Sequence, residues 1–303
     1  MLKNRIFRRS IIGFLITLAV LYVAASAFLY FQQDQIGFPI LTKYERVTPA
    51  ALGIPFEDLH IPLDGADQIH AWWLPASSDK VLLLFHGNGY VLEENITLAL
   101  RAKSGLPPPP GMPSQFDLIP LHQLGVNILA IDYRGFGSST PVNLSEKRAI
   151  EDANAAFTYL TVQRQISPRK IVFIGWSLGT GPATEMAKEH PDAGGLVLVS
   201  AFTSTFDIVK YSPDLWYVRL LPYPLLLHTR FDNLSKMNSV HVPVLIVVGS
   251  VEEGAVHSGA AFFQKANEPK RLYVSPGAGH DNVWVIKTDQ LMAEISGFIQ
   301  SLH

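Results

Sequence analysis

The chain has 303 residues, of which 48% are hydrophobic and 17% are charged. This composition excludes a disordered or collagen-like chain and supplies enough apolar side chains for one large core. The absence of cysteine excludes disulfide bonds, thiolate metal sites and a cysteine nucleophile. Lys3, Arg5, Arg8 and Arg9 are four of the 24 basic residues, so the rest of the chain, with 26 acidic residues, is poorly suited to bind nucleic acid.

These basic residues precede an uncharged apolar run over residues 11–31. As a helix the run would extend about 31 Å at about 1.5 Å per residue, which matches a bilayer hydrocarbon core of about 30 Å. A cleavable signal peptide is the alternative, because Ala25-Ser26-Ala27 resembles a cleavage site, although its apolar segment is normally shorter. We predict a single-pass anchor in residues 1–33 and one folded domain in residues 34–303, which the positive flank places outside the cytoplasm.

Eight short apolar segments alternate with helical patterns after residue 57. This alternation predicts an α/β fold, in which an eight-stranded, mostly parallel sheet is covered by helices on both faces. The first two strands are separated by Asp64-Gly65 and are expected to form an antiparallel pair at an edge. The predicted strands are residues 57–63, 68–75, 81–85, 127–131, 171–175, 196–200, 244–249 and 271–275.

Amphipathic patterns predict helices over residues 146–160, with Ser145 as N-cap, and over residues 289–302. Two segments interrupt the alternation. Residues 105–120 contain four consecutive prolines and are interpreted as a surface insertion, in preference to a partner-binding proline motif. Residues 206–234 are too long and apolar for a simple crossover, and form either a cap over a site or a helical excursion packed on the sheet edge.

The most specific motif is Gly175-Trp176-Ser177-Leu178-Gly179, a G-x-S-x-G between a predicted strand and a predicted helix. A serine at such a sharp turn is exposed to substrate, and the flanking glycines let the neighbouring backbone approach closely. We predict that Ser177 is a nucleophile and that the N–H of Leu178 contributes to an oxyanion hole. The alternative is a glycine-rich turn without chemistry.

A second oxyanion amide is expected in His86-Gly87-Asn88-Gly89, which follows the strand at 81–85. We choose the amide of Asn88, with that of Gly89 as the alternative. His86 precedes Ser177, whereas catalytic residues that accompany a G-x-S-x-G serine follow the order serine, acid, histidine along the chain. His86 is therefore interpreted as a residue that orders the loop.

The general base is expected after the last strand, where His280 follows a glycine-rich turn. The acid should follow the strand at 244–249, and Glu252 is preferred there over Glu253. Asp207, after the strand at 196–200, is a possible substitute or a helix cap. The sequence has no HExxH, GxxxxGK or helix-opening GxGxxG, so we expect neither a metal nor a nucleotide cofactor.

The chain resembles the α/β-hydrolase superfamily, and specifically its membrane-anchored branch related to the Bem46 and ABHD12/13/17-type serine hydrolases. The resemblance is carried by HGNG (86–89), DYRGFGSS (132–139), GWSLG (175–179), SAFTS (200–204), RFDNL (230–234), VPVLIVVGS (242–250) and PGAGHDN (276–282). It implies that Asp132 and Arg134 hold the oxyanion loop. Relatives mostly have aspartate where Glu252 stands and proline near His257, and the insertion at 105–120 is a further departure that would displace the helix after the oxyanion loop.

These features together predict a membrane-anchored serine hydrolase without a cofactor. Ser177, His280 and Glu252 would cleave a carboxylic ester or thioester, such as a lipid acyl ester, through an acyl-enzyme. Two alternatives stay open. The same residues could hydrolyse a peptide or amide, or the chain could be a non-catalytic anchored scaffold.

Overall fold

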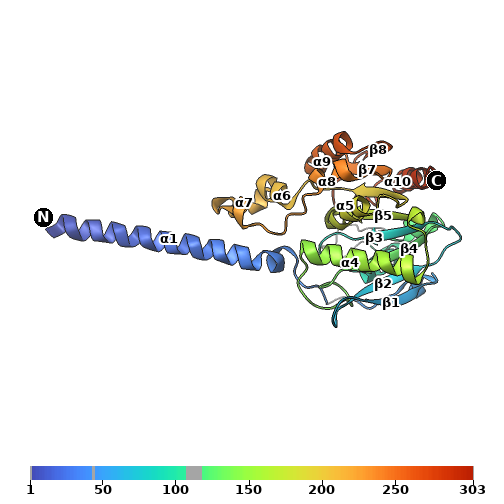
Figure 1. Ribbon diagram of the computed structural model, residues 1–303, viewed down its shortest axis with the longest axis horizontal. Coiled ribbons are helices and arrows are strands. Elements are labelled where there is room, and N and C mark those ends of the chain that lie inside the picture. The colour runs from blue at the N-terminus through green and yellow to red at the C-terminus, as the bar shows by residue number, and fades with distance from the viewer. Residues whose placement is uncertain (1, 43–44, 107–117, 303) are drawn as a thin grey trace.

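The computed structural model describes residues 2–42, 45–106 and 118–302. A long helix, α1, stands out from a compact α/β body (Figure 1). The helices, in chain order, are α1 (Leu2–Gly37), α2 (Leu92–Lys103), α3 (Leu118–Gln123), α4 (Glu146–Thr158), α5 (Thr180–Glu189), α6 (Thr205–Tyr211), α7 (Tyr223–Leu226), α8 (Asn233–Lys236), α9 (Glu253–Lys265) and α10 (Thr288–Gln300).

Within the described residues, eight strands form one sheet in the order β1-β2-β4-β3-β5-β6-β7-β8. The pairs β1–β2 and β2–β4 are antiparallel and the remaining pairs are parallel, which confirms the predicted fold class and the antiparallel edge. The strands are β1 (Glu57–Pro62), β2 (Gln68–Leu74), β3 (Val81–Phe85), β4 (Asn127–Asp132), β5 (Ile171–Trp176), β6 (Gly195–Val199), β7 (Val244–Gly249) and β8 (Lys270–Ser275).

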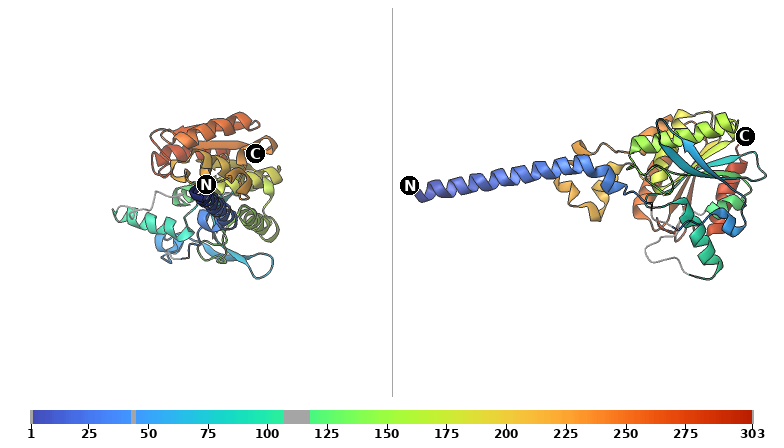
Figure 2. Two further views of the ribbon diagram at one scale, coloured as in Figure 1. Left: turned by 90° about the vertical axis from the view of Figure 1, so that its left-hand side faces the viewer. Right: turned by 90° about the horizontal axis from the view of Figure 1, so that it is seen from below.

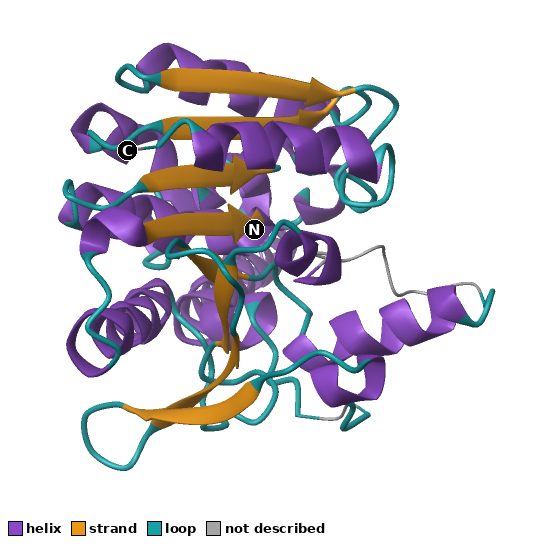
Figure 3. Cartoon of the chain, turned by 90° about the vertical axis from the view of Figure 1, so that its right-hand side faces the viewer, coloured by secondary structure: helices purple, strands orange, loops and turns teal. Residues whose placement is uncertain are grey.

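Helices cover both faces of this twisted sheet (Figure 3). One hydrophobic core contains α4, α5 and α9, and the other contains α2, α3 and α10. The central strands β3, β5 and β7 are buried at every residue, as expected for strands of a parallel sheet with two covered faces. This double burial explains why these strands are continuous apolar runs in the sequence.

Helix α4 begins as predicted. The Oγ of Ser145 accepts a hydrogen bond of 3.3 Å from the N–H of Arg148, so one free donor of the first turn is satisfied. Residues Tyr159–Gln163 continue α4 as a π-helical turn.

The insertion predicted at 105–120 is only partly described, because residues 107–117 lie outside the described residues. Its end differs from the expectation, since residues 118–120 open α3. A helix does follow the oxyanion loop directly, because α2 starts at Leu92.

Helix α1 continues through residue 33, where we predicted the anchor to end, and stops at Gly37. Its segment Arg5–Gly37 is long and apolar enough to cross a membrane, and a signal sequence near the N-terminus has the same properties. The segment predicted as a cap or excursion forms α6, α7 and short 3-10 turns beside the C-terminal end of α1, displaced from the sheet (Figures 1 and 2).

Candidate active site

Ser177 occupies the sharp turn between β5 and α5, with a positive φ of 49°. The glycines of the motif are required by close backbone contacts. A Cβ on Gly175 would lie 2.3 Å from the carbonyl oxygen of Gly179, and a Cβ on Gly179 would lie 2.0 Å from that of Phe85. The turn is therefore locked against the end of β3, and its serine is held in a conformation that side chains other than glycine rarely adopt.

His280 lies on the loop between β8 and α10 and reaches the serine. Its Nε2 is 3.0 Å from the Oγ of Ser177, and its Nδ1 is hydrogen-bonded to the carboxylate of Glu252. The structure thus brings together three residues from the ends of three strands. Burial lowers the pKa of His280, but the hydrogen bond and charge of Glu252 more than offset it, so the pKa is raised above its ordinary value.

Glu252 is held from its other side by a residue that sequence reasoning missed. The Oγ of Ser200 donates to Oε2 of Glu252 at 2.9 Å. Ser200 is buried at the end of β6 and has a positive φ of 50°. It lies in the SAFTS segment, but a single serine after a strand has no pattern that signals such a role.

Asp207, one of the two other acid candidates, has its own partners away from the histidine. Asp207 lies in the first turn of α6, where its carboxylate accepts hydrogen bonds from the hydroxyls of Thr203 and Ser204. The N-cap of α6 is Ser204, whose Oγ accepts a hydrogen bond of 3.0 Å from the N–H of Asp207, so Asp207 is a first-turn residue and not the cap itself. Glu253 opens α9, and its side chain lies outside the described residues.

The loop at 86–89 lies against the serine turn, as an oxyanion loop should. A Cβ on Gly87 would lie 2.9 Å from the indole ring of Trp176, and the carbonyl of His86 would be 2.9 Å from a Cβ on Gly179. Gly89 adopts a positive φ of 83°. The Asn88 side chain donates to the carbonyl oxygen of Gly37 at 2.8 Å.

Asp132 ties this loop to the sheet. Its Oδ1 accepts a hydrogen bond of 3.0 Å from the N–H of Leu92 and lies 3.5 Å from Nε2 of His86. Burial lowers the pKa of the His86 ring, which favours its neutral form. The predicted loop-ordering roles of His86 and Asp132 agree with this geometry.

The guanidinium of Arg134 is paired with three carboxylates. It donates to Asp152 at 2.7 Å, to Glu151 at 2.6 Å and to Asp67 at 3.1 Å. These contacts join α4 to the turn between β1 and β2. No contact of Arg134 with the loop at 86–89 is among these bonds of the described residues, so the role that the resemblance implies for it stays a prediction.

Among the described residues, His70, Glu93 and Asp132 have potential metal ligands within 4.8 Å of one another. Both ring nitrogens of His70 already face carboxylates, at 3.0 Å from Asp132 and 2.7 Å from Asp58. Burial lowers the pKa of His70, but these two carboxylates outweigh it and raise the pKa to about 9. An imidazolium paired in this way competes with a metal cation, so the cluster is a buried ion pair.

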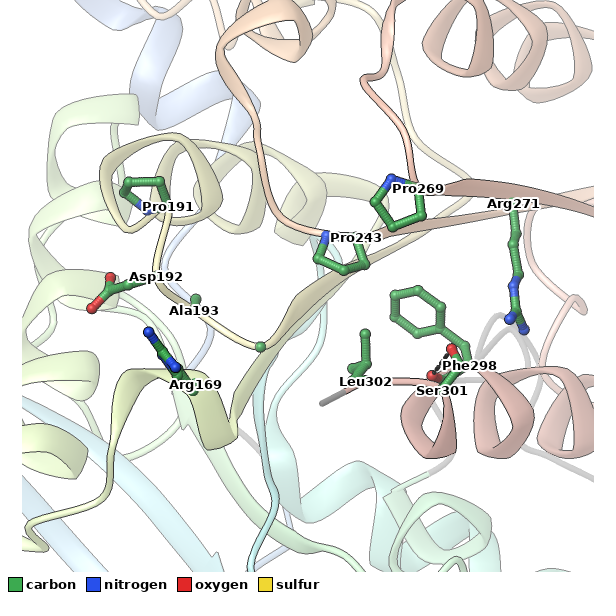
Figure 4. Close-up of a pocket in the computed structure, with 11 residues that line it drawn as sticks. Arg169, Pro191, Asp192, Ala193, Pro243, Pro269, Arg271, Phe298, Ser301 and Leu302 are labelled. Carbon is green, nitrogen blue, oxygen red and sulfur yellow. Dashed lines mark hydrogen bonds between the residues drawn. The ribbon is translucent and has the colours of Figure 1, made fainter.

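A pocket of about 720 Å³ is lined by residues such as Arg169, Pro243 and Pro269 (Figure 4). Pro243 and Pro269 in its wall precede β7 and β8, whereas Ser177 and Glu252 follow strands. Its location separates it from the candidate catalytic residues, because ligands of open α/β sheets bind at the carboxyl ends of the strands.

The eight-stranded, mostly parallel sheet with helices on both faces is the fold of an α/β hydrolase. A family model described as "Alpha/beta hydrolase family" matches residues 81–294, which is more than half of the chain. The chain therefore belongs to the alpha/beta hydrolase family.

Curated relatives match part of the chain. An uncharacterized protein of Mycobacterium tuberculosis is 34% identical over 184 residues, covering 60% of this chain and 62% of the relative. The alpha/beta hydrolase domain-containing protein 17B of Homo sapiens is 28% identical over 162 residues, covering 53% and 52%. The chain thus spans between about half and three fifths of the length of these relatives.

Solved structures share the fold over most of the chain. The Pyrococcus furiosus esterase Pf2001 superposes with a TM-score of 0.63 at 19% identity, covering 86% of this chain and 98% of the esterase. An alpha-beta hydrolase from Vibrio vulnificus gives 0.62 at 19% identity, covering 90% and 91%. At this identity the likeness concerns the fold.

Proposed function

We propose that the protein is a serine hydrolase that cleaves a carboxylic ester or thioester through an acyl-enzyme. The observation that carries the proposal is the continuous chain of contacts from Ser177 through His280 to Glu252. Membership of the alpha/beta hydrolase family and the likeness in fold to an esterase support it.

In the first half-reaction, the Oγ of Ser177 attacks the carbonyl carbon while Nε2 of His280 takes the hydroxyl proton. The negative charge that develops on the carbonyl oxygen is stabilised by the backbone amides of Leu178 and Asn88. The bond to the leaving group then breaks, and His280 returns its proton to the alcohol or thiol.

In the second half-reaction, His280 deprotonates a water that attacks the acyl carbon, and the proton passes to Ser177 Oγ as the acid leaves. Glu252 orients the imidazole and stabilises its positive charge in both halves. The chemistry requires no cofactor.

We also propose that α1 is retained as a single membrane span with the hydrolase domain outside the cytoplasm. Its length and composition support a span, and the four basic residues at its start support this orientation.

Hydrolysis of p-nitrophenyl esters of graded chain length by the detergent-solubilised full chain tests the activity. Ser177→Ala should abolish hydrolysis, while Ser104→Ala, at an exposed serine after α2, should leave it unchanged. Full activity in Ser177→Ala would overturn the proposal. Cleavage of amide but not ester substrates by the wild-type chain would favour the peptide or amide hydrolase alternative.

A further inference from the structure

The segment that follows β6 forms a small unit beside α1, which we call the platform (residues 205–227). It consists of α6, two 3-10 turns at Pro213–Leu215 and Val218–Leu220, and α7. Figures 1 and 2 show it next to the C-terminal end of α1 and away from the sheet. Its own core is small and contains Val209, Val218 and Leu227, against which Leu29 of α1 packs.

Polar contacts fix the end of the platform, and the two residues that follow it, to the end of α1. The buried Nε2 of Gln33 donates to the carbonyl oxygen of Leu226 at 3.0 Å and to Nδ1 of His228 at 2.6 Å, and Oε1 of Gln33 accepts from the N–H of His228 at 3.0 Å. The hydroxyl of Thr229 donates to Asp34 at 2.6 Å. The position of the platform along α1 is therefore defined by specific hydrogen bonds.

The platform exposes large apolar and aromatic side chains. Leu225 is 81% exposed and Trp216 is 59% exposed, although the other four tryptophans of the chain, all described, are at most 7% exposed. A soluble surface seldom gathers such side chains without a partner. The exposed set comprises Ile208, Tyr211, Trp216, Tyr217, Leu220 and Leu225.

Two observations indicate a lipid bilayer as the partner. The platform touches Leu29 and Gln33, which lie in the last turns of the helix that is long and apolar enough to cross a membrane. Tyr30 packs against His228, directly after the platform. When α1 crosses a bilayer, the platform therefore lies at the membrane surface. Tryptophan and tyrosine are also enriched at that interface, where one part of the ring is apolar and the other is hydrated.

We propose that the platform inserts its exposed aromatic and leucine side chains into the interface of the bilayer that α1 crosses, as a second membrane contact. Its four charged side chains, Asp207, Lys210, Asp214 and Arg219, carry no net charge. Arg219 also donates to three backbone carbonyls within the platform. The contact is therefore apolar, and it forms with neutral phosphatidylcholine without a requirement for anionic lipid.

This contact also orients the domain. The platform follows β6 at the carboxyl edge of the sheet, which is the edge that carries Ser177 and Glu252. The loop at 86–89 reaches the end of α1 through the hydrogen bond from Asn88 to Gly37. The edge with the candidate catalytic residues therefore faces the bilayer.

Site-specific labelling of the full chain in phosphatidylcholine nanodiscs tests the proposal. Since the chain has no cysteine, Leu225→Cys introduces a single site for an NBD fluorophore. The matched control is Val162→Cys, which is 67% exposed in the turn after α4. Glu146, at the start of α4, accepts hydrogen bonds from the N–H groups of Arg230 and Phe231, which follow the platform closely in the chain. Val162 lies about 24 Å from Glu146 along this helix, at about 1.5 Å per residue, and is therefore distant from the platform.

The label at 225 should be quenched by lipids brominated on their acyl chains and protected from aqueous dithionite, whereas the label at 162 should show neither effect. Equal reduction of both labels by dithionite would overturn the proposal. Protection at 225 without quenching by brominated lipid would also overturn it, because a second copy of the chain would then cover the platform.

Native tryptophan fluorescence provides the same test without a label. The brominated lipid should quench the part of the emission that is lost in Trp216→Phe, and the remaining emission should be unaffected because the other tryptophans are buried in the domain. An equal response of wild type and Trp216→Phe to brominated lipid would contradict the inference. The Tm of each variant should equal that of the wild type, which checks that the substitution leaves the fold unchanged.

Discussion

Ser200 donates a hydrogen bond of 2.9 Å to Glu252, so the carboxylate that faces His280 is fixed from two sides. The two residues come from the ends of the neighbouring strands β6 and β7. A carboxylate with one oxygen on a hydroxyl and the other on an imidazole has little rotational freedom.

Loss of the Ser200 hydroxyl should therefore weaken catalysis without affecting substrate binding. A hydrogen bond to a charged group contributes about 1.5–3 kcal/mol, so Ser200→Ala should lower kcat by roughly ten- to a hundredfold with KM unchanged. Steady-state kinetics on a soluble ester measure both parameters, with Ser104→Ala as the control. An unchanged kcat would show that Glu252 needs no support from Ser200.

The activity should depend on pH through His280, which must be neutral to accept a proton. Burial lowers the pKa of His280, but Glu252 raises it by more, so the net pKa is above the ordinary value of about 6.5. We therefore expect kcat/KM to increase with pH through a midpoint above that value. Glu252→Gln removes the favourable charge and leaves the burial. Its midpoint should move to lower pH, and kcat should fall by up to about 10⁴.

A pH profile of Glu252→Gln with the same midpoint as wild type would contradict the assignment of the acid. Asp207→Asn is the matched control, because Asp207 contacts Thr203 and Ser204 at the start of α6. It should leave both the midpoint and kcat near the wild-type values.

Gly179 should tolerate no side chain, because a Cβ would lie 2.0 Å from the carbonyl oxygen of Phe85. Gly179→Ala should lose activity and destabilise the domain by about 1–3 kcal/mol or more, which corresponds to a decrease in Tm of at least about 2 °C. Gly297→Ala is the control within α10, since nothing lies within 4 Å of its Cβ. It should stabilise the domain by up to about 1 kcal/mol. Equal Tm values for the two variants would contradict the packing described for the serine turn.

The buried pair of His70 and Asp132 should make stability depend on pH at the alkaline end. The pKa of His70 is raised to about 9 in the folded chain by the two carboxylates that outweigh its burial, and it is about 6.5 when unfolded. Its contribution is thus complete below about pH 6.5 and is lost as the pH rises through about 9. The difference in Tm between wild type and His70→Gln should decrease between pH 7 and pH 10, and a constant difference would contradict the ion pair.

Much of the fold is predictable from the sequence because the central strands of the sheet are buried on both faces. Such strands are short runs of β-branched and aliphatic residues, and all eight predicted segments match a strand to within one residue at each end. The turns after β5 and β8 then limit the positions of Ser177 and His280. Glu252 follows from its place after β7.

Contacts between distant segments are not predictable in this way. Ser200 reaches Glu252 only because β6 and β7 end side by side, and a serine after a strand carries no pattern of its own. In the sequence, Gln33 is a polar residue just after the apolar run of α1. In the structure it is buried and bonded to Leu226 and His228, nearly 200 positions away. Both roles depend on tertiary packing, to which hydrophobic periodicity is insensitive.

The activated serine is the central claim, and covalent labelling tests it most directly. The full chain in detergent should react with a fluorophosphonate, and peptide mass spectrometry should locate the adduct on Ser177. Ser177→Ala should remain unlabelled and His280→Gln should react far more slowly, because the serine then lacks its base. A wild-type chain that stays unlabelled, or that carries the adduct on another serine, would contradict the account.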